Sequence, residues 1–269
     1  MRAFQHHFAF EFKTAVRNKN LLLLNYLFPV GFYLMMALIM PGINPTFLET
    51  LIPAMVIFAI LAATMLGLPD PLVSARESGI YRTYKINGIP AASILLIPAL
   101  TTLLHLGIVT AFIVITASVF FNAPSPTDWG GFSLTFFAAS AACIGLAVLI
   151  GVISSTTRMT VLWAQLIFVP SMLLGGMMLP YSLLPPFGQI IAKLLPATYA
   201  MNTFNALAMG GTADFDAYIS AAILISGGLL AFGLAMFLFQ WDRNNKTHNR
   251  HPALGLLALI PYVIGIFLL

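Results

Sequence analysis

The sequence predicts an all-α fold, a polytopic bundle of membrane-spanning helices, and three observations support this prediction. Hydrophobic residues make up 60% of the 269 positions and charged residues only 7%, whereas about 25% of the residues of a soluble domain are charged. The mean hydropathy of +0.96 indicates that the outer solvent is mostly lipid. Six apolar runs are long enough to cross a bilayer, which takes about 20 residues. A soluble globular protein is therefore excluded.

The six predicted spans leave no room for a sizeable water-soluble domain. They are residues 21–40, 48–68, 93–121, 132–153, 161–179 and 218–240, within a transmembrane domain of residues 21–240. The third run is longer than a span needs, which implies a tilted helix or a stub beyond the bilayer. The single cysteine, Cys143, excludes an intramolecular disulfide and a multi-cysteine metal site. We expect no metal site in this chain.

Lys and Arg residues orient the spans, because basic connections stay in the cytoplasm. Eleven of the twelve basic residues lie before the first span or after the second, fourth and sixth, and the remaining connections hold only Lys193. Both ends of the six-span unit, the N-terminus included, are therefore predicted to be cytoplasmic, in a multi-pass protein of the inner or plasma membrane. The net charge of +4 follows from this topology and gives little support to nucleic-acid binding.

The N-terminal segment, residues 1–20, is predicted to form an amphipathic helix. Phe4, Phe8 and Phe12 recur at i, i+4 spacing, and basic residues occupy the opposite arc. A helix of this kind lies on the cytoplasmic surface of the membrane and contacts its lipid.

The C-terminal segment, residues 241–269, combines a basic cytosolic tail with an apolar stretch from Ala253 to Leu269. This stretch has 17 residues, the lower limit for a spanning helix. It is either a seventh span or a segment that lies in the interface or packs against the bundle, and the sequence favours the seventh span.

The cytoplasmic connection after the second span, residues 69–92, is punctuated by prolines at both ends. Between them, Val73, Glu77, Ile80 and Tyr84 recur at helical spacing, which predicts a short helix that projects into the cytosol. Two roles remain open for this segment. It is either merely a basic connection that fixes the topology, or a helix that docks on a soluble partner.

The external connection after the fifth span, residues 180–211, is too apolar for a solvated loop. Residues 183–195 and 197–209 are each thirteen residues long, too short to span, and Pro196 separates them. Two half-helices that enter from the outside and turn back fit this pattern, because a broken backbone is tolerated where protein buries it. An interfacial helix pair is the alternative.

A few polar side chains lie within the predicted spans and are candidates for a substrate pathway, because polar groups in a membrane are costly unless paired or beside water. The candidates are Asn25, Thr101, His105 and Gln165. Interhelical hydrogen bonding explains these residues equally well. The near absence of charged residues within the spans argues against a proton- or sodium-coupled carrier.

Together these segments resemble the permease subunits of ABC transporters of the second type, over nearly the whole six-span unit. That family has a Glu-containing turn, a Gly and a later Pro after the second span. Arg76-Glu77-Ser-Gly79 and Gly88-Ile-Pro90 match it here, although the family's usual doubled Glu is reduced to one. The family's signature after the fifth span is matched more specifically, by Gly175-Gly176, Pro180, Leu195-Pro196-Ala-Thr198-Tyr199 and Gly210-Gly211. The segment after Pro252 departs from the usual six-span plan.

The resemblance implies a coupling helix around Glu77 that sits in a groove of a cytosolic ABC ATPase. The residues expected at this contact are Arg76, Glu77, Gly79, Arg82 and Lys85. It also implies a pair of short external helices that guard the exit, with Pro180, Pro196, Thr198 and Tyr199 as the residues that carry the signature.

The chain has no G-x-x-x-x-G-K-[ST] phosphate loop. We therefore expect a transporter subunit that is not itself an enzyme and holds no cofactor, with ATP and Mg bound by the partner ATPase. Two ATPase subunits and a second permease, identical or paralogous, complete a transporter of this family. The resemblance implies an exporter of an amphipathic drug, a lipid-like or a polysaccharide-linked compound. An ATP-independent channel or secondary carrier is the alternative, and an accessory subunit without its own pathway is a third hypothesis.

Overall fold

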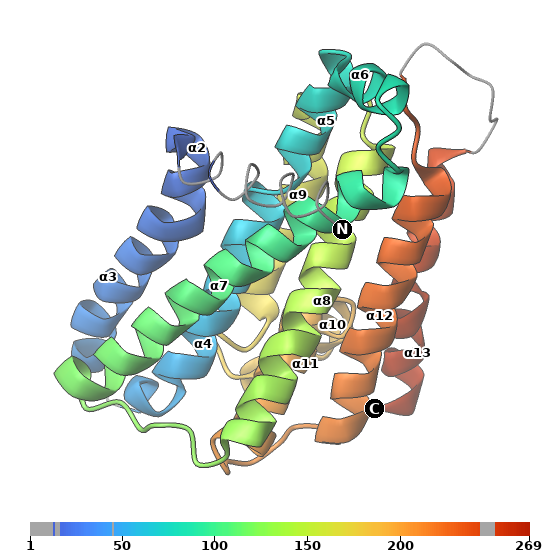
Figure 1. Cartoon of the computed structure of the whole chain (residues 1–269). Coiled ribbons are helices and arrows are strands. Elements are labelled where there is room, and N and C mark those ends of the chain that lie inside the picture. The colour runs from blue at the N-terminus through green and yellow to red at the C-terminus, as the bar shows by residue number, and fades with distance from the viewer. Residues whose placement is uncertain (1–12, 14–16, 45, 243–250) are drawn as a thin grey trace.

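The computed structural model describes residues 13, 17–44, 46–242 and 251–269. Most of the predicted N-terminal amphipathic helix and of the basic tail lies outside these residues. Within them the chain is helical, without strands, and six helical segments are long and apolar enough to cross a membrane. These segments are Lys19–Ile43, Phe47–Glu77, Ala91–Phe121, Trp129–Ile153, Thr157–Leu174 and Ala217–Leu238 (Figure 1). The all-α prediction with six spans is therefore confirmed.

Each of the first two spans contains a short π-helical segment. The first span comprises α2 (Lys19–Leu22), the π-helix η1 (Leu23–Leu27) and α3 (Phe28–Ile43). The second comprises α4 (Phe47–Leu61) and the π-helix η2 (Ala62–Leu66). The two π-helical segments pack against each other. Such segments are rare and are frequently found at functional sites.

The second span continues beyond η2 into the connection that the sequence predicts to be cytoplasmic. Here α5 (Pro69–Glu77) and α6 (Ile80–Ile86) stand in place of the single short helix that the sequence spacing suggests. Gly79 divides them, because its φ of +76° is a left-handed conformation that interrupts a right-handed helix and that glycine adopts readily. The chain then enters the third span, α7 (Ala91–Phe121).

The remaining spans are α8 (Trp129–Ile153), α9 (Thr157–Leu174) and α12 (Ala217–Leu238). All three begin at a capping side chain. The carboxylates of Asp128 and Asp216 accept hydrogen bonds from Gly130 N (2.7 Å) and Ile219 N (2.9 Å), and Thr156 Oγ1 accepts one from Met159 N (3.4 Å). Each cap satisfies a backbone N–H that has no partner within its helix.

Between α9 and α12 lies the connection that the sequence predicts to be external, residues 180–211, which is called the external hairpin. It contains η3 (Tyr181–Leu183), α10 (Pro186–Ala192), α11 (Pro196–Thr203) and the π-helix η4 (Phe204–Ala208). The second half-helix has nearly the predicted length, whereas the first is shorter than the thirteen residues suggested by the sequence. All eight residues of α11 are buried, against α4, α8, α9 and α12.

The C-terminal apolar stretch folds as the 3₁₀-helix η5 (Pro252–Leu259) and the helix α13 (Ile260–Leu268). They lie along α12, and the C-terminus lies beside the start of that helix (Figure 1). Because a 3₁₀-helix rises about 2.0 Å per residue and an α-helix about 1.5 Å, the two segments together extend about 30 Å. That length equals the hydrocarbon thickness of a typical bilayer.

The core lies around the second and fourth spans. We compare the most apolar 18-residue stretch of each span. In the second span 94% of this stretch is buried and in the fourth 83%, whereas in the other spans at most 44% is buried. Helices in lipid gain little from hydrophobic burial against one another, so close backbone packing holds them together. One close crossing joins α8 and α12, where a Cβ on Gly145 would lie 2.4 Å from the carbonyl oxygen of Gly228.

We predict that Gly228→Ala destabilises the protein by about 1–3 kcal/mol, the usual cost of overpacking. The added Cβ would lie 2.6 Å from the backbone of Ala141, so α8 and α12 must separate. Thermal unfolding of the purified protein in detergent measures the effect. Gly233→Ala is the matched control on the same helix, because a Cβ there meets nothing within 4 Å. Equal melting temperatures for the two variants would contradict the assigned crossing.

Candidate functional site

The two loop helices, α5 and α6, form one end of the bundle (Figure 1) and are attached to two different spans. On α5, the Arg76 guanidinium donates hydrogen bonds to the carbonyl oxygen of Val152 (2.7 Å) and to that of Ser154. These carbonyls lie at the end of α8, where the last turn has no intrahelical donors and where a cation also interacts favourably with the helix dipole. Arg76 therefore joins α5 to the end of α8.

On α6, Arg82 forms an ion pair with Asp242 at 2.6 Å, and the ring of Tyr81 packs against Phe239 with 5.6 Å between the ring centres. Both partners follow the end of α12. The hydrogen bond from Arg82 to Asp242, together with the charge of that carboxylate, raises the pKa of Arg82 above its usual value. The exposed ion pair orients α6 more than it stabilises the fold, while the buried Tyr81 ring supplies packing.

The remaining residues of the expected ATPase contact lie on the outer surface of the same two helices. Glu77 and Lys85 are exposed, and Gly79 lies between them at the junction of α5 and α6. Ile86, 86% exposed, adds an apolar side chain to this surface. A polar rim around an apolar centre is the general arrangement of a protein interface.

At the opposite end of the bundle, side-chain hydrogen bonds stabilise the external hairpin. Pro196 begins α11, and within that helix Thr198 Oγ1 and Tyr199 Oη donate to the carbonyl oxygens of Ala192 and Lys193, each at 2.6 Å. These carbonyls end α10, so both hydroxyls close the turn between the two half-helices. Pro180 lies outside this cluster, exposed just before η3.

Asn202 is the residue of the hairpin that sequence reasoning missed. Its side-chain nitrogen donates to Phe215 O and Ser220 Oγ, both at 3.0 Å, and its oxygen accepts from Asp214 N (2.8 Å) and Phe215 N (3.1 Å). An amide-bearing side chain in a segment this apolar was the available signal. Asn202 joins α11 to the connection that leads into α12.

Asp214 lies beside this network, and partial burial raises the pKa of its carboxyl group above the usual value. Burial also raises the pKa of the Tyr181 hydroxyl, to which the negative charge of Asp214 adds.

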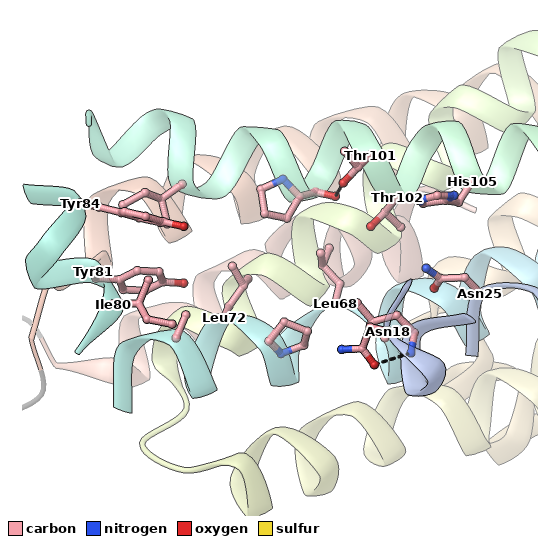
Figure 2. Close-up of a pocket in the computed structure, with 16 residues that line it drawn as sticks. Asn18, Asn25, Leu68, Leu72, Ile80, Tyr81, Tyr84, Thr101, Thr102 and His105 are labelled. Carbon is pink, nitrogen blue, oxygen red and sulfur yellow. Dashed lines mark hydrogen bonds between the residues drawn. The ribbon is translucent and has the colours of Figure 1, made fainter. Parts of the chain in front are cut away.

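Three of the four candidate pathway residues meet in one cavity, which has a volume of about 340 Å³. Asn25 comes from η1, and Thr101 and His105 come from α7 (Figure 2). The Tyr26 hydroxyl and His105 Nδ1 share a hydrogen bond of 2.5 Å, which holds the imidazole in place. Gln165 does not join them, because it is exposed on α9. In the described part of the chain, no group of three or more His, Cys, Asp or Glu side chains is placed to hold a metal ion.

These features define the class of the protein. It is a multi-pass helical membrane protein with two short helices, α5 and α6, at one end of its bundle and a pair of half-helices near the other, of which α11 is buried. A model of the ABC-2 type transporter family matches residues 2–209, and the chain belongs to this family. It is therefore the transmembrane, permease component of an ABC transporter, a family that generally works with ABC ATPase partners. No curated protein and no solved structure matches the chain.

We predict that Asn202→Ala lowers stability by roughly 1–3 kcal/mol, because two partly buried backbone N–H groups lose their acceptor. Limited proteolysis in the hairpin and thermal unfolding in detergent measure the loss. Ser220→Ala is the matched variant, since it removes one partner of the amide nitrogen and leaves both N–H groups on the amide oxygen. We expect Ser220→Ala to be milder, and an equal loss in both variants would contradict the assigned role of the amide oxygen.

Proposed function

We propose that the chain is the permease subunit of an ATP-driven exporter, which acts with two cytosolic ATPase subunits and a second permease, identical or paralogous. ATP and Mg bind to the ATPase chains. The cargo is an amphipathic small molecule or a lipid-like or polysaccharide-linked compound. The protein lies in the inner or plasma membrane, with its N-terminus in the cytoplasm.

One observation carries this proposal: α5 and α6 are attached to the ends of both α8 and α12. Arg76 holds the first contact and Arg82 the second, and Glu77 and Lys85 lie on the exposed surface of the same two helices. A partner that moves these helices therefore moves two packed spans at once. ATP-driven closure of the ATPase pair supplies such a movement. The bound nucleotide then shifts the equilibrium between the conformational states of the permease.

The external hairpin is attached to the opposite ends of the same two spans, α8 and α12. The backbone N–H groups of Thr127 and Asp128, just before α8, donate to the carbonyl oxygen of Ala208 in the hairpin, at 2.8 and 3.2 Å. Asn202 bonds to Ser220 of α12. The same two spans that hold the loop helices thus hold the hairpin, so a movement at one end is transmitted to the proposed exit.

We predict that Glu77→Ala leaves the chain in the membrane but lowers vanadate-sensitive ATP turnover several-fold, because the docking surface loses a charged contact. Purification of the tagged chain from its native membrane with its partners, followed by an ATPase assay, measures this. Glu49→Ala is the control, since Glu49 is an exposed acid at the start of α4. Normal turnover in Glu77→Ala would remove the assigned role of Glu77. Purification without any ATPase, combined with solute transport in liposomes, would establish an ATP-independent carrier instead.

We also predict that η5 and α13 form a seventh span, so that residue 269 is external. A phosphatase reporter that is active only outside the cytoplasm is fused after Leu269 or, as the control, after Asp242. We expect activity only in the first fusion, because about 30 Å of apolar helix separates the two positions. Cytoplasmic reporters in both fusions would show that this segment stays on the cytoplasmic side.

A further inference from the structure

The cavity that brings Asn25, Thr101 and His105 together lies within a single chain. Its walls come from the start of the first span, from both loop helices and from α7. The cavity therefore connects the surface proposed to meet the ATPase with two membrane spans. Its volume of about 340 Å³ falls within the range of small-molecule pockets.

The floor of the cavity is polar and buried. Asn25 is 6% exposed, Thr102 is 7% exposed and His105 is fully buried. Figure 2 shows Asn25, Thr102 and His105 at the same end of the cavity, from two different spans. An amide, a hydroxyl and an imidazole offer both donors and acceptors, so they suit a ligand with a hydrogen-bonding head group.

The opposite end is aromatic and apolar. Tyr81 and Tyr84 of α6 lie side by side there, with Leu72 beside them (Figure 2). Ile80, also in the lining, is 43% exposed. Aromatic and aliphatic walls suit the apolar part of an amphipathic molecule.

The lining, which consists of described residues, includes no Asp, Glu, Lys or Arg. An ionised ligand would lose its hydration in this cavity without meeting an opposite charge, which is costly. The cavity therefore favours a neutral molecule. If each water occupies about 30 Å³, the space holds about eleven waters, or a ligand of roughly a dozen non-hydrogen atoms.

The backbone beside the floor has an unusual form that supports the same conclusion. Asn25 and Tyr26 lie in the π-helix η1, and the cavity residue Gly67 directly follows the π-helix η2. A Cβ on Gly67 would lie 3.0 Å from the side-chain oxygen of Asn25. Two adjacent π-helical segments thus shape the polar floor, as is frequent at functional sites.

We propose that this cavity binds an uncharged amphipathic small molecule of roughly a dozen non-hydrogen atoms, with its polar head against Asn25, Thr102 and His105 and its apolar body against Tyr81 and Tyr84. The inference rests on the proposed transport function and names the class of cargo. Because α5 and α6 form part of the walls, a bound cargo contacts the same helices that are proposed to meet the ATPase.

Equilibrium binding of three matched probes to the full chain in phosphatidylcholine nanodiscs tests this proposal. Naphthamide is neutral, naphthoate carries a negative charge and naphthylmethylammonium a positive one, and all three share the same ring system. Empty nanodiscs give the partition into lipid. We expect saturable binding of naphthamide, and at least tenfold weaker binding of both charged probes.

Substitutions then locate the binding. Asn25→Leu and the milder Thr102→Val should each weaken naphthamide binding about tenfold, whereas Gln165→Leu, a comparable change on the exposed face of α9, should leave it unchanged. Binding no greater than in empty nanodiscs, equal binding of all three probes, or equal losses in Asn25→Leu, Thr102→Val and Gln165→Leu would overturn the proposal.

The assay contains no ATPase and no nucleotide, which separates the two hypotheses. A chain that binds naphthamide as expected but recruits no ATPase contradicts only the proposed function. A chain that recruits an ATPase but binds no probe contradicts only the cargo site.

Discussion

The structure depends on one constraint: in lipid, every backbone N–H and C=O group must find a partner within the protein. A regular helix meets this constraint by itself, but the breaks at both ends of this bundle do not. The external hairpin meets it with side chains, because Thr198, Tyr199 and Asn202 bond to backbone groups at its turns. At the other end, Arg76 bonds to the carbonyls that end α8. At both ends of the bundle, polar side chains of an apolar sequence therefore lie where helices stop.

The contacts at the two ends of the bundle are joined through α8 and α12. Their crossing at Gly145 and Gly228 leaves no room even for a Cβ, so neither helix can slide past the other without separating. Each bears a contact to the loop helices at one end and to the hairpin at the other. Packed cores respond to force by moving between discrete arrangements rather than by deforming continuously. A pair of spans packed this closely is thus suited to transmit a movement across the membrane.

The sequence predicted the spans well because composition alone determines them: a run of about 20 apolar residues has few other stable environments. It predicted less where single residues set the local backbone. Gly79 divides the loop helix through its positive φ. Helix α9 ends at Leu174, just before Gly175 and Gly176, and therefore five residues before the predicted end of the fifth span. Grouping Asn25 with His105 required the fold, since about 80 residues separate them. Gln165 carried the same signal, and only the rotation of α9 places it on the outside.

The C-terminal segment shows why a departure from the six-span plan still fits this architecture. The family match ends at residue 209, so η5 and α13 lie outside it. Nevertheless, the fully buried ring of Tyr262 lies over Gly227 of α12, where a Cβ would approach its hydroxyl oxygen to 2.7 Å. Farther along, Gly265 lies against the Tyr199 hydroxyl of the hairpin, since a Cβ there would lie 2.4 Å away. The added segment covers the side of the bundle where Tyr199 bonds to the end of α10, and it thereby shields that polar turn from lipid, as the requirement for internal hydrogen bonding demands.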